Sequence, residues 1–324
     1  MNDPLPQHRL SLENIAAASA TIDPVFLQTP QYESTRLSEA LGCRLTMKVE
    51  TANPIGSFKG RGAGYFLESV VRRGDRRRLV CASTGNFGQA MAYACRAHDR
   101  DLVVFADESA NELKMSRIRQ LGAEVRLEGD DFDTAKEAAR QFCEDHGAWM
   151  IEDGREPEIS EGAGTIGVEL TRDRSFDIVL IPVGNGALIS GVARWMKAVS
   201  PTTRLIGVSA TGADAMAESW RGGGIVERPG VETIAEGIAV RIPVPEAVED
   251  MRPIVDEMVL VDDIQMIESM RTLHRLAGQL VEPSGAAGIA AIAADPDDYT
   301  GMRVATVMTG NNLTEQQIDR WLWA

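Results

Sequence analysis

The sequence predicts an α/β protein of two lobes, each an open, mostly parallel sheet flanked by helices. Short apolar segments alternate with helical patterns between residues 79 and 151, and again after residue 177. Such alternation is typical of parallel sheets, because each helix crosses over between neighbouring strands and covers a face of the sheet. With 324 residues, 44% of them hydrophobic, the chain is long enough to bury two cores.

The first part of the chain holds a helix and a strand before the alternation begins. Ser11 can cap a helix over residues 11–20, and a strand is expected over Leu45–Glu50. A helical pattern begins at Gly62, and the arginine-rich stretch 72–78 is interpreted as a solvated connection. The next expected strands are Leu79–Ala82, Leu102–Ala106, Glu124–Leu127 and Trp149–Ile151, separated by helices 86–97, 111–121 and 132–145.

The second half of the chain repeats this rhythm. The expected helices are 162–171, 188–199, 262–277, 284–294 and 314–322, and the expected strands are Asp177–Pro182, Arg204–Ser209 and Arg303–Met308. We therefore assign residues 71–151 to a smaller domain and residues 1–70 with 152–324 to a larger one.

Composition excludes several classes of function. A net charge of −15 argues against nucleic acid, because a phosphate backbone would be repelled over most of the surface. Membrane association is not expected, since no apolar run approaches the length of a membrane span, and the N-terminus lacks the apolar core of a signal peptide. The four cysteines and four histidines have no metal-ligand spacing, so we expect free thiols in the cytoplasm and no metal.

The stretch Asn53–Arg61 (NPIGSFKGR) places one lysine, Lys59, where a strand gives way to a helix. A lysine in a partly apolar pocket beside an aromatic ring is a candidate Schiff-base former, since desolvation disfavours its charged form and frees the amine. The alternative is a solvated surface lysine. On this stretch alone the two interpretations are equally supported.

Three further loops follow predicted strands, where ligands of parallel sheets collect. The loop Ser83–Gln89 (STGNFGQ) opens a helix whose exposed N–H groups favour a carboxylate, or it is only a capped glycine turn. The loop Gly184–Leu188 (GNGAL) has glycines that allow a phosphate to approach the backbone, although it is neither a Walker loop nor a dinucleotide fingerprint. The loop Thr309–Asn312 (TGNN) alone would be a turn. Together with Lys59, these loops form the set that a phosphorylated aldehyde cofactor needs.

Seven motifs in order resemble those of the fold-type-II pyridoxal-phosphate enzymes, specifically the serine/threonine dehydratase and serine racemase group. They are GSFKGRGA, STGNFGQA, EGAGTI, VGNGAL, TIAEG, PSGAA and TGNN, and the resemblance runs from about Leu12 to about Asn312. It implies the two-domain fold of the tryptophan synthase β type, with pyridoxal 5'-phosphate held by the larger domain. It also implies an amino-acid substrate and a homodimer.

The resemblance assigns roles to individual residues. Lys59 would bind the cofactor as a Schiff base and move the α-proton, and Phe58 would pack against the pyridine ring. The phosphate would be bound by Gly184, Asn185, Gly186, Ala187 and Leu188. Asn86 would bind the ring hydroxyl and Thr309 the pyridine nitrogen, and the substrate would be bound by Ser83, Thr84, Asn86, Gln89 and Glu236.

A neutral hydroxyl at the pyridine nitrogen leaves the ring a weaker electron sink, which favours prompt loss of a β-leaving group. We therefore expect an ammonia-lyase that converts a 3-hydroxy amino acid, such as threonine or serine, to a 2-oxo acid and ammonia. The alternatives are a racemase and a β- or γ-replacement synthase, although threonine synthases typically have Asp where this chain has Gly60. A binding module that only kept the fold is disfavoured by the intact Lys59.

The chain also departs from the group at several positions. Glu152-Asp153-Gly154 replaces an apolar, proline-containing segment, and Glu236 replaces an aspartate. We expect these three acidic residues to disfavour a dianionic substrate and to favour neutral or cationic side chains, unless Glu152 and Asp153 are merely solvated at a domain edge. Ser209 replaces a metal-binding glutamate of the racemases, which predicts no metal there.

Thr84 is a further position at which the chain differs from the group. Racemases of the group carry a serine at this position and many threonine dehydratases an alanine. A hydroxyl here can exchange a proton on the side of the cofactor opposite Lys59, so we expect elimination with slow racemisation as a side activity. The alternative is that Thr84 only binds the substrate carboxylate or caps the helix over 86–97.

Overall fold

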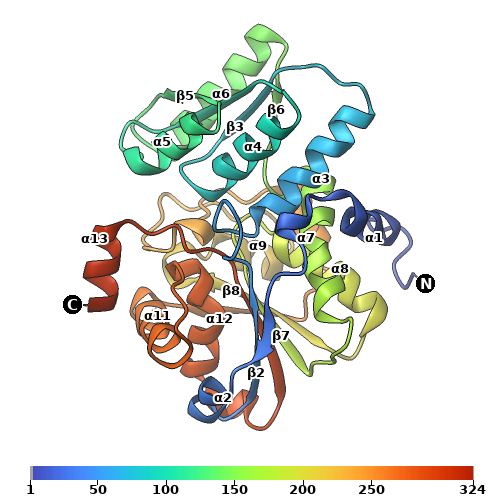
Figure 1. Cartoon of the computed structure of the whole chain (residues 1–324), viewed down its shortest axis with the longest axis vertical. Coiled ribbons are helices and arrows are strands. Elements are labelled where there is room, and N and C mark those ends of the chain that lie inside the picture. The colour runs from blue at the N-terminus through green and yellow to red at the C-terminus, as the bar shows by residue number, and fades with distance from the viewer. Residues whose placement is uncertain (1–2, 324) are drawn as a thin grey trace.

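The computed structural model describes residues 3–323 and contains two sheets (Figure 1). The larger sheet has six strands in the order β1-β2-β10-β7-β8-β9, and the smaller has four in the order β5-β4-β3-β6. Every strand pair is parallel except β1 with β2. This is the α/β architecture that the alternation predicts.

The strands are β1 (Gln31–Glu33), β2 (Arg44–Val49), β3 (Leu79–Ala82), β4 (Leu102–Ala106), β5 (Glu124–Leu127), β6 (Trp149–Met150), β7 (Ile178–Pro182), β8 (Arg204–Ala210), β9 (Glu257–Val261) and β10 (Arg303–Met308). The helices are α1 (Leu12–Thr21), α2 (Thr35–Leu41), α3 (Lys59–Arg72), α4 (Asn86–Ala97), α5 (Glu112–Gln120), α6 (Phe132–His146), α7 (Pro157–Leu170), α8 (Ala187–Val199), α9 (Ala215–Gly222), α10 (Pro245–Met251), α11 (Asp263–Ala277), α12 (Pro283–Ala294) and α13 (Glu315–Ile318).

The two sheets are drawn from separate stretches of the chain. The smaller sheet uses only residues 79–150, which fall inside the segment 71–151 that we assigned to the smaller domain. Figure 1 shows this sheet with α4, α5 and α6 above the larger sheet, with α3 and α7 between them. Among the described residues, no helix is both long and apolar enough to cross a membrane. Cys43, Cys81 and Cys95 are buried free thiols, and the free thiol of Cys143 is half-buried.

Several element boundaries differ from the prediction. The lysine helix α3 begins at Lys59 rather than Gly62, because Ser57 Oγ accepts the Lys59 N–H (3.2 Å) and satisfies one of the free donors of the first turn. Helix α7 begins at Pro157 rather than residue 162, since proline suits the first helical position. The last helix ends at Ile318 and continues as a π-helical turn over Asp319–Trp323.

Five elements were not predicted: β1, β9, α2, α9 and α10. Strands β1 and β9 lie at the two edges of the larger sheet, and the three helices have eight residues or fewer. Edge strands are buried on fewer sides and short helices complete few turns, so their apolar periodicity is weak.

Helices α3 and α7 touch through glycines, which fixes the position of the lysine loop. A Cβ on Gly62 would lie 2.6 Å from Ile159 O, and one on Gly162 would lie 2.6 Å from Arg61 O. Real Cβ atoms are never this close to a backbone oxygen, so larger residues at either position would push the two helices apart.

A buried ionic network lies beneath the start of α3. The Arg61 guanidinium, with no exposed surface, donates to Glu50 Oε2 (2.8 Å) and to Glu169 Oε1 (2.7 Å). Lys48 also pairs with Glu169. Burial by itself would raise the pKa of the Glu169 carboxyl, but the hydrogen bonds and charges of Arg61 and Lys48 outweigh burial and lower that pKa to about 2.

We predict that Glu169→Gln lowers the free energy of unfolding by about 3–5 kcal/mol at pH 7, because it leaves the two buried cations Arg61 and Lys48 with the single counter-charge of Glu50. A carboxyl whose pKa is lowered in the folded state stabilises the fold at pH values above its ordinary pKa of 4.5. This contribution is lost as the pH falls toward 2, the pKa in the folded state. In urea unfolding, the difference in free energy of unfolding between wild type and variant should therefore become smaller as the pH is lowered from 4.5 to 3.

The matched control is Glu137→Gln, whose side chain is 72% exposed on α6. It should change the free energy of unfolding by no more than about 0.5 kcal/mol at any of these pH values. If the free energies of unfolding of the wild type and Glu169→Gln differ by the same amount at pH 7 and at pH 3, the role assigned to Glu169 in this network is wrong.

Candidate active site

One cavity of about 490 Å³ lies where the carboxyl ends of β2, β3, β7 and β10 meet. Every site residue named from the sequence lines it except Gln89: the lining includes Phe58, Lys59, Ser83, Thr84, Asn86, Gly184, Asn185, Gly186, Ala187, Leu188, Glu236 and Thr309. Four loops far apart in the sequence are therefore brought together at the position that parallel sheets provide for ligands.

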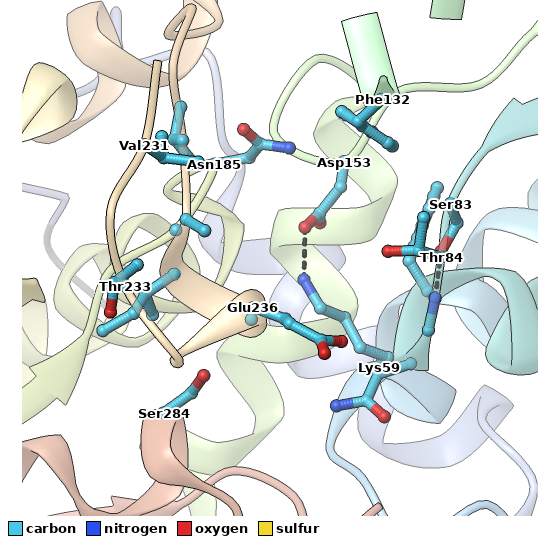
Figure 2. Close-up of a pocket in the computed structure, with 18 of the residues that line it drawn as sticks. Lys59, Ser83, Thr84, Phe132, Asp153, Asn185, Val231, Thr233, Glu236 and Ser284 are labelled. Carbon is cyan, nitrogen blue, oxygen red and sulfur yellow. Dashed lines mark hydrogen bonds and ion pairs between the residues drawn. The ribbon is translucent and has the colours of Figure 1, made fainter. Parts of the chain in front are cut away.

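Lys59 is the first residue of α3, and its side chain is only 14% exposed. Its Nζ lies 4.7 Å from the centroid of the Phe58 ring and forms an ion pair with Asp153. Figure 2 shows the lysine reaching across the cavity to that carboxylate. The loop before it is held by a hydrogen bond from Phe58 N to Thr309 O (3.0 Å), which joins the lysine loop to the end of β10.

The loop from Gly184 to Leu188 presents unpaired donors to the cavity. None of its five backbone N–H groups has a hydrogen-bond acceptor among residues 3–323. Helix α8 begins here with Gly186 in the left-handed region (φ +88°) and without a side-chain cap, so its first turn adds a partial positive charge. A Cβ on Gly184 would lie 2.6 Å from Gly237 O, so only glycine fits.

Asn86 and Thr309 place polar groups at the floor of the cavity. Asn86 Nδ2 donates to Glu282 Oε1 (2.7 Å), and its Oδ1 accepts from Asn312 Nδ2 (2.7 Å), which fixes the amide and leaves a second Nδ2 hydrogen for a ligand. Thr309 also lines the cavity, and its hydroxyl makes no hydrogen bond within the described part of the chain. Burial raises the pKa of the Glu282 carboxyl to about 6. Sequence reasoning missed Glu282, although it directly precedes the PSGAA motif.

The loop that begins α4 has both satisfied and free groups. Ser83 Oγ accepts from Gly85 N (3.2 Å) and Gly88 N (2.9 Å), so its oxygen serves the turn itself. In residues 3–323, the backbone N–H groups of Asn86 and Phe87 have no acceptor. Gln89 is buried and does not line the cavity, so its role in carboxylate binding stays a prediction without support from its position.

Glu152 and Asp153 are buried, so they are not residues solvated at a domain edge. Glu152 pairs with the cations Lys136, Arg140 and Arg155. Across the cavity, ion pairs join Lys114 to Glu236 and Arg241 to Asp133. None of these cations was singled out from the sequence. Lys136 and Arg140 lie one turn apart on α6, and Arg155 is three residues from Glu152, but Lys114 and Arg241 are more than a hundred residues from their partners.

Comparisons with known proteins identify what this arrangement resembles. Residues 22–310 match the family described as pyridoxal-phosphate dependent enzyme. An L-threonine ammonia-lyase of Thermotoga maritima is 35% identical over 96% of this chain and 78% of its own length. A biosynthetic L-threonine dehydratase of Halalkalibacterium halodurans is 30% identical over 94% of this chain and 74% of its own length.

Solved structures are similar over the same extent. The processed form of threonine deaminase isoform 2 from Solanum lycopersicum has a TM-score of 0.87 at 29% identity, covering 96% of this chain and 93% of that one. Maize serine racemase has a TM-score of 0.88 at 26% identity, covering 96% of each chain.

The cavity fits pyridoxal phosphate on its own geometry. Five unpaired N–H groups at the start of α8 suit a phosphate, and a largely buried lysine with an adjacent aromatic ring suits an aldehyde and a flat heterocycle. Asn86 and Thr309 would hold the polar edge of the ring, as expected from the sequence.

We predict that Gly184→Ala weakens cofactor binding by at least about tenfold, because the added methyl must displace either the 3-10 turn at Gly237 or the loop Gly184–Leu188. Titration of the cofactor-free protein, followed by visible absorbance, measures this dissociation constant. Gly224→Ala is the control, since a Cβ there meets nothing within 4 Å. Equal cofactor dissociation constants for the two variants would refute the assignment of the loop Gly184–Leu188 as the phosphate site.

Proposed function

Because this chain belongs to the pyridoxal-phosphate dependent enzyme family, we propose that it is an ammonia-lyase acting on a 3-hydroxy amino acid of the threonine and serine kind. Overall, the substrate gives a 2-oxo acid and ammonia. The Cα–H and Cβ–O bonds break, the hydroxyl leaves as water, and the enamine product takes up water and releases ammonia. The relatives named as threonine ammonia-lyases and dehydratases support this choice.

The observation that carries the proposal is the neutral group at the end of β10. Thr309 lines the cavity, and its hydroxyl has no hydrogen-bond partner in residues 3–323. The carboxylate of Glu282 is engaged by Asn86 and by Asn312 N (3.2 Å). The bound cofactor supplies an electron sink for the α-carbon, and a neutral partner for its nitrogen keeps that sink weak. A weak sink favours expulsion of a β-hydroxyl over chemistry that needs a long-lived carbanion.

The residues of the chain have separable tasks in this reaction. Lys59 Nζ takes the α-proton, and its position in the first turn of α3 holds it at the centre of the cavity. The free N–H groups of Asn86 and Phe87 at the start of α4 bind the substrate carboxylate, where the helix end favours an anion. The homodimer and the cytoplasmic location are part of the proposal and rest on the resemblance and the free thiols.

Lys59→Ala should lose the covalently bound cofactor and at least about 100-fold in rate, because both the attachment point and the base are removed. Mass spectrometry after borohydride reduction detects the covalent link, and 2-oxo acid formation from threonine and serine detects turnover. Lys197→Ala is the control, since that lysine pairs with Asp256 outside the cavity. Full activity in Lys59→Ala would rule out the proposed function.

Thr84→Ala tests whether racemisation accompanies elimination. Thr84 lines the cavity and its hydroxyl has no partner in residues 3–323, so it is available either to exchange a proton or to bind the carboxylate. If it exchanges a proton, the variant should lose α-proton exchange into D-isomers while elimination from the L-substrate survives. If it only binds, KM should rise for both isomers together. Equal damage to both activities argues against a second base.

A further inference from the structure

Nearly every charged side chain that lines the cavity has its own partner. Glu152 is matched by three cations, Glu236 by Lys114, and Arg241 by Asp133. Asp131 caps the start of α6 through Thr134 N (2.8 Å), and Glu282 is held by the amides of Asn86 and Asn312. The expectation that three acidic residues disfavour a dianionic substrate and favour neutral or cationic side chains therefore reduces to one residue, Asp153, whose partner is Lys59.

Asp153 is an incompletely satisfied, rigidly held carboxylate. Only 8% of the surface of this residue is exposed, and its Oδ1 has no hydrogen-bond partner in the described chain. The backbone behind it cannot shift freely, because a Cβ on Gly154 would lie 2.2 Å from Asn185 O. Glu152 on the other side is anchored by its cations. Asp153 thus projects into the cavity from a fixed backbone (Figure 2).

Lys59 cannot neutralise Asp153 while it does chemistry. To accept the α-proton its amine must be uncharged, and attachment of the cofactor occupies the same nitrogen. In the reacting complex the buried Asp153 carboxylate would then have no cation, and a buried, uncompensated charge is strongly unfavourable. A phosphate at the adjacent Gly184–Leu188 loop would add further negative charge, so a second positive group is needed.

We propose that the substrate supplies this positive group: Asp153 binds an ammonium on the side chain of a 3-hydroxy amino acid. This inference rests on the proposed function. By occupying Asp153, the substrate's ammonium prevents the Lys59 amine from pairing with this carboxylate again once the amine is free, so that the amine stays uncharged and can act as the base. Selectivity for a cationic side chain is thereby coupled to the start of the reaction.

The position of the ammonium follows from the contacts. Asp153 Oδ2 is in contact with Lys59 Nζ, and the substrate α-carbon must also come within about 3–3.5 Å of that nitrogen to react. A cation on Asp153 is therefore only a few bonds from the α-carbon. Because the β-carbon carries the hydroxyl that leaves, the ammonium belongs on the γ-carbon. The substrate class is that of 2,4-diamino-3-hydroxybutanoate.

The first test compares side chains of equal size on the holoenzyme. The substrates are 2,4-diamino-3-hydroxybutanoate, which ends in an ammonium, and 2-amino-3-hydroxypentanoate, which ends in a methyl group at the same position. The ratio of their kcat/KM values should be at least tenfold in favour of the ammonium, because a charged hydrogen bond is gained. Asp153→Asn should lower this ratio at least tenfold, whatever loss it causes to both substrates. Glu137→Gln is the control and should keep the ratio within threefold, since it removes one carboxylate that is 72% exposed and does not line the cavity.

The second test needs no cofactor. Lys59→Ala should leave Asp153 exposed to an added cation, so propylammonium should raise its melting temperature in a saturable way. Propanol, the neutral analogue, should not, and Lys59→Ala/Asp153→Asn should lose the response to propylammonium.

The outcomes separate the two hypotheses. A wild-type ratio near one, an unchanged ratio in Asp153→Asn, or identical melting responses of the single and double variants would overturn the role of Asp153. If the wild type forms no 2-oxo acid from either substrate or from threonine, the proposed function fails. The propylammonium test still decides whether Asp153 is a cation site.

Discussion

The buried guanidinium of Arg61 is the constraint on which the active site depends. It is two residues after Lys59 in the first turn of α3, and its hydrogen bonds reach Glu50 at the end of β2 and Glu169 on α7. A buried charge tolerates little displacement, because each lost partner leaves an uncompensated ion in a medium of low dielectric constant. The network therefore fixes the start of α3, and with it the direction in which the Lys59 amine enters the cavity.

The two sides of the cavity are built with different kinds of interaction. On the side of the larger sheet, close glycine contacts between α3 and α7 and backbone hydrogen bonds between the lysine loop and β10 hold the cofactor-facing groups. Across the cavity to the smaller sheet, the connections include the pairs Lys114–Glu236 and Arg241–Asp133, in which the Glu236 side chain is 53% exposed. Both pairs are partly exposed, and partly exposed ion pairs contribute less to stability than the buried network of Arg61. The rigid side is thus suited to positioning, and the weakly bridged side to admitting a substrate.

The electrostatics of the site are local and do not follow from the overall charge of −15. Around the cavity, carboxylates and cations are paired residue by residue, which lowers the cost of burying them together. The exception is the Lys59–Asp153 pair, in which one member must give up its charge for the reaction to occur. In the resting protein, Lys59 neutralises the Asp153 carboxylate. A reacting substrate therefore has to supply a positive charge in place of Lys59.

The sequence by itself determined the α/β class, the strands Leu79–Ala82, Leu102–Ala106, Glu124–Leu127 and Arg303–Met308, and the four loops that carry the site. These follow from local information: apolar runs of strand length, glycines at strand ends, and a lysine between an aromatic residue and a glycine. Only the tertiary structure decided that Gln89 does not line the cavity, that Glu152 is matched by three cations, and that Asp153 meets Lys59. Apart from the local pair of Arg155 with Glu152, these charge pairings join residues from about ten to about a hundred positions apart, and no periodicity along the chain encodes them.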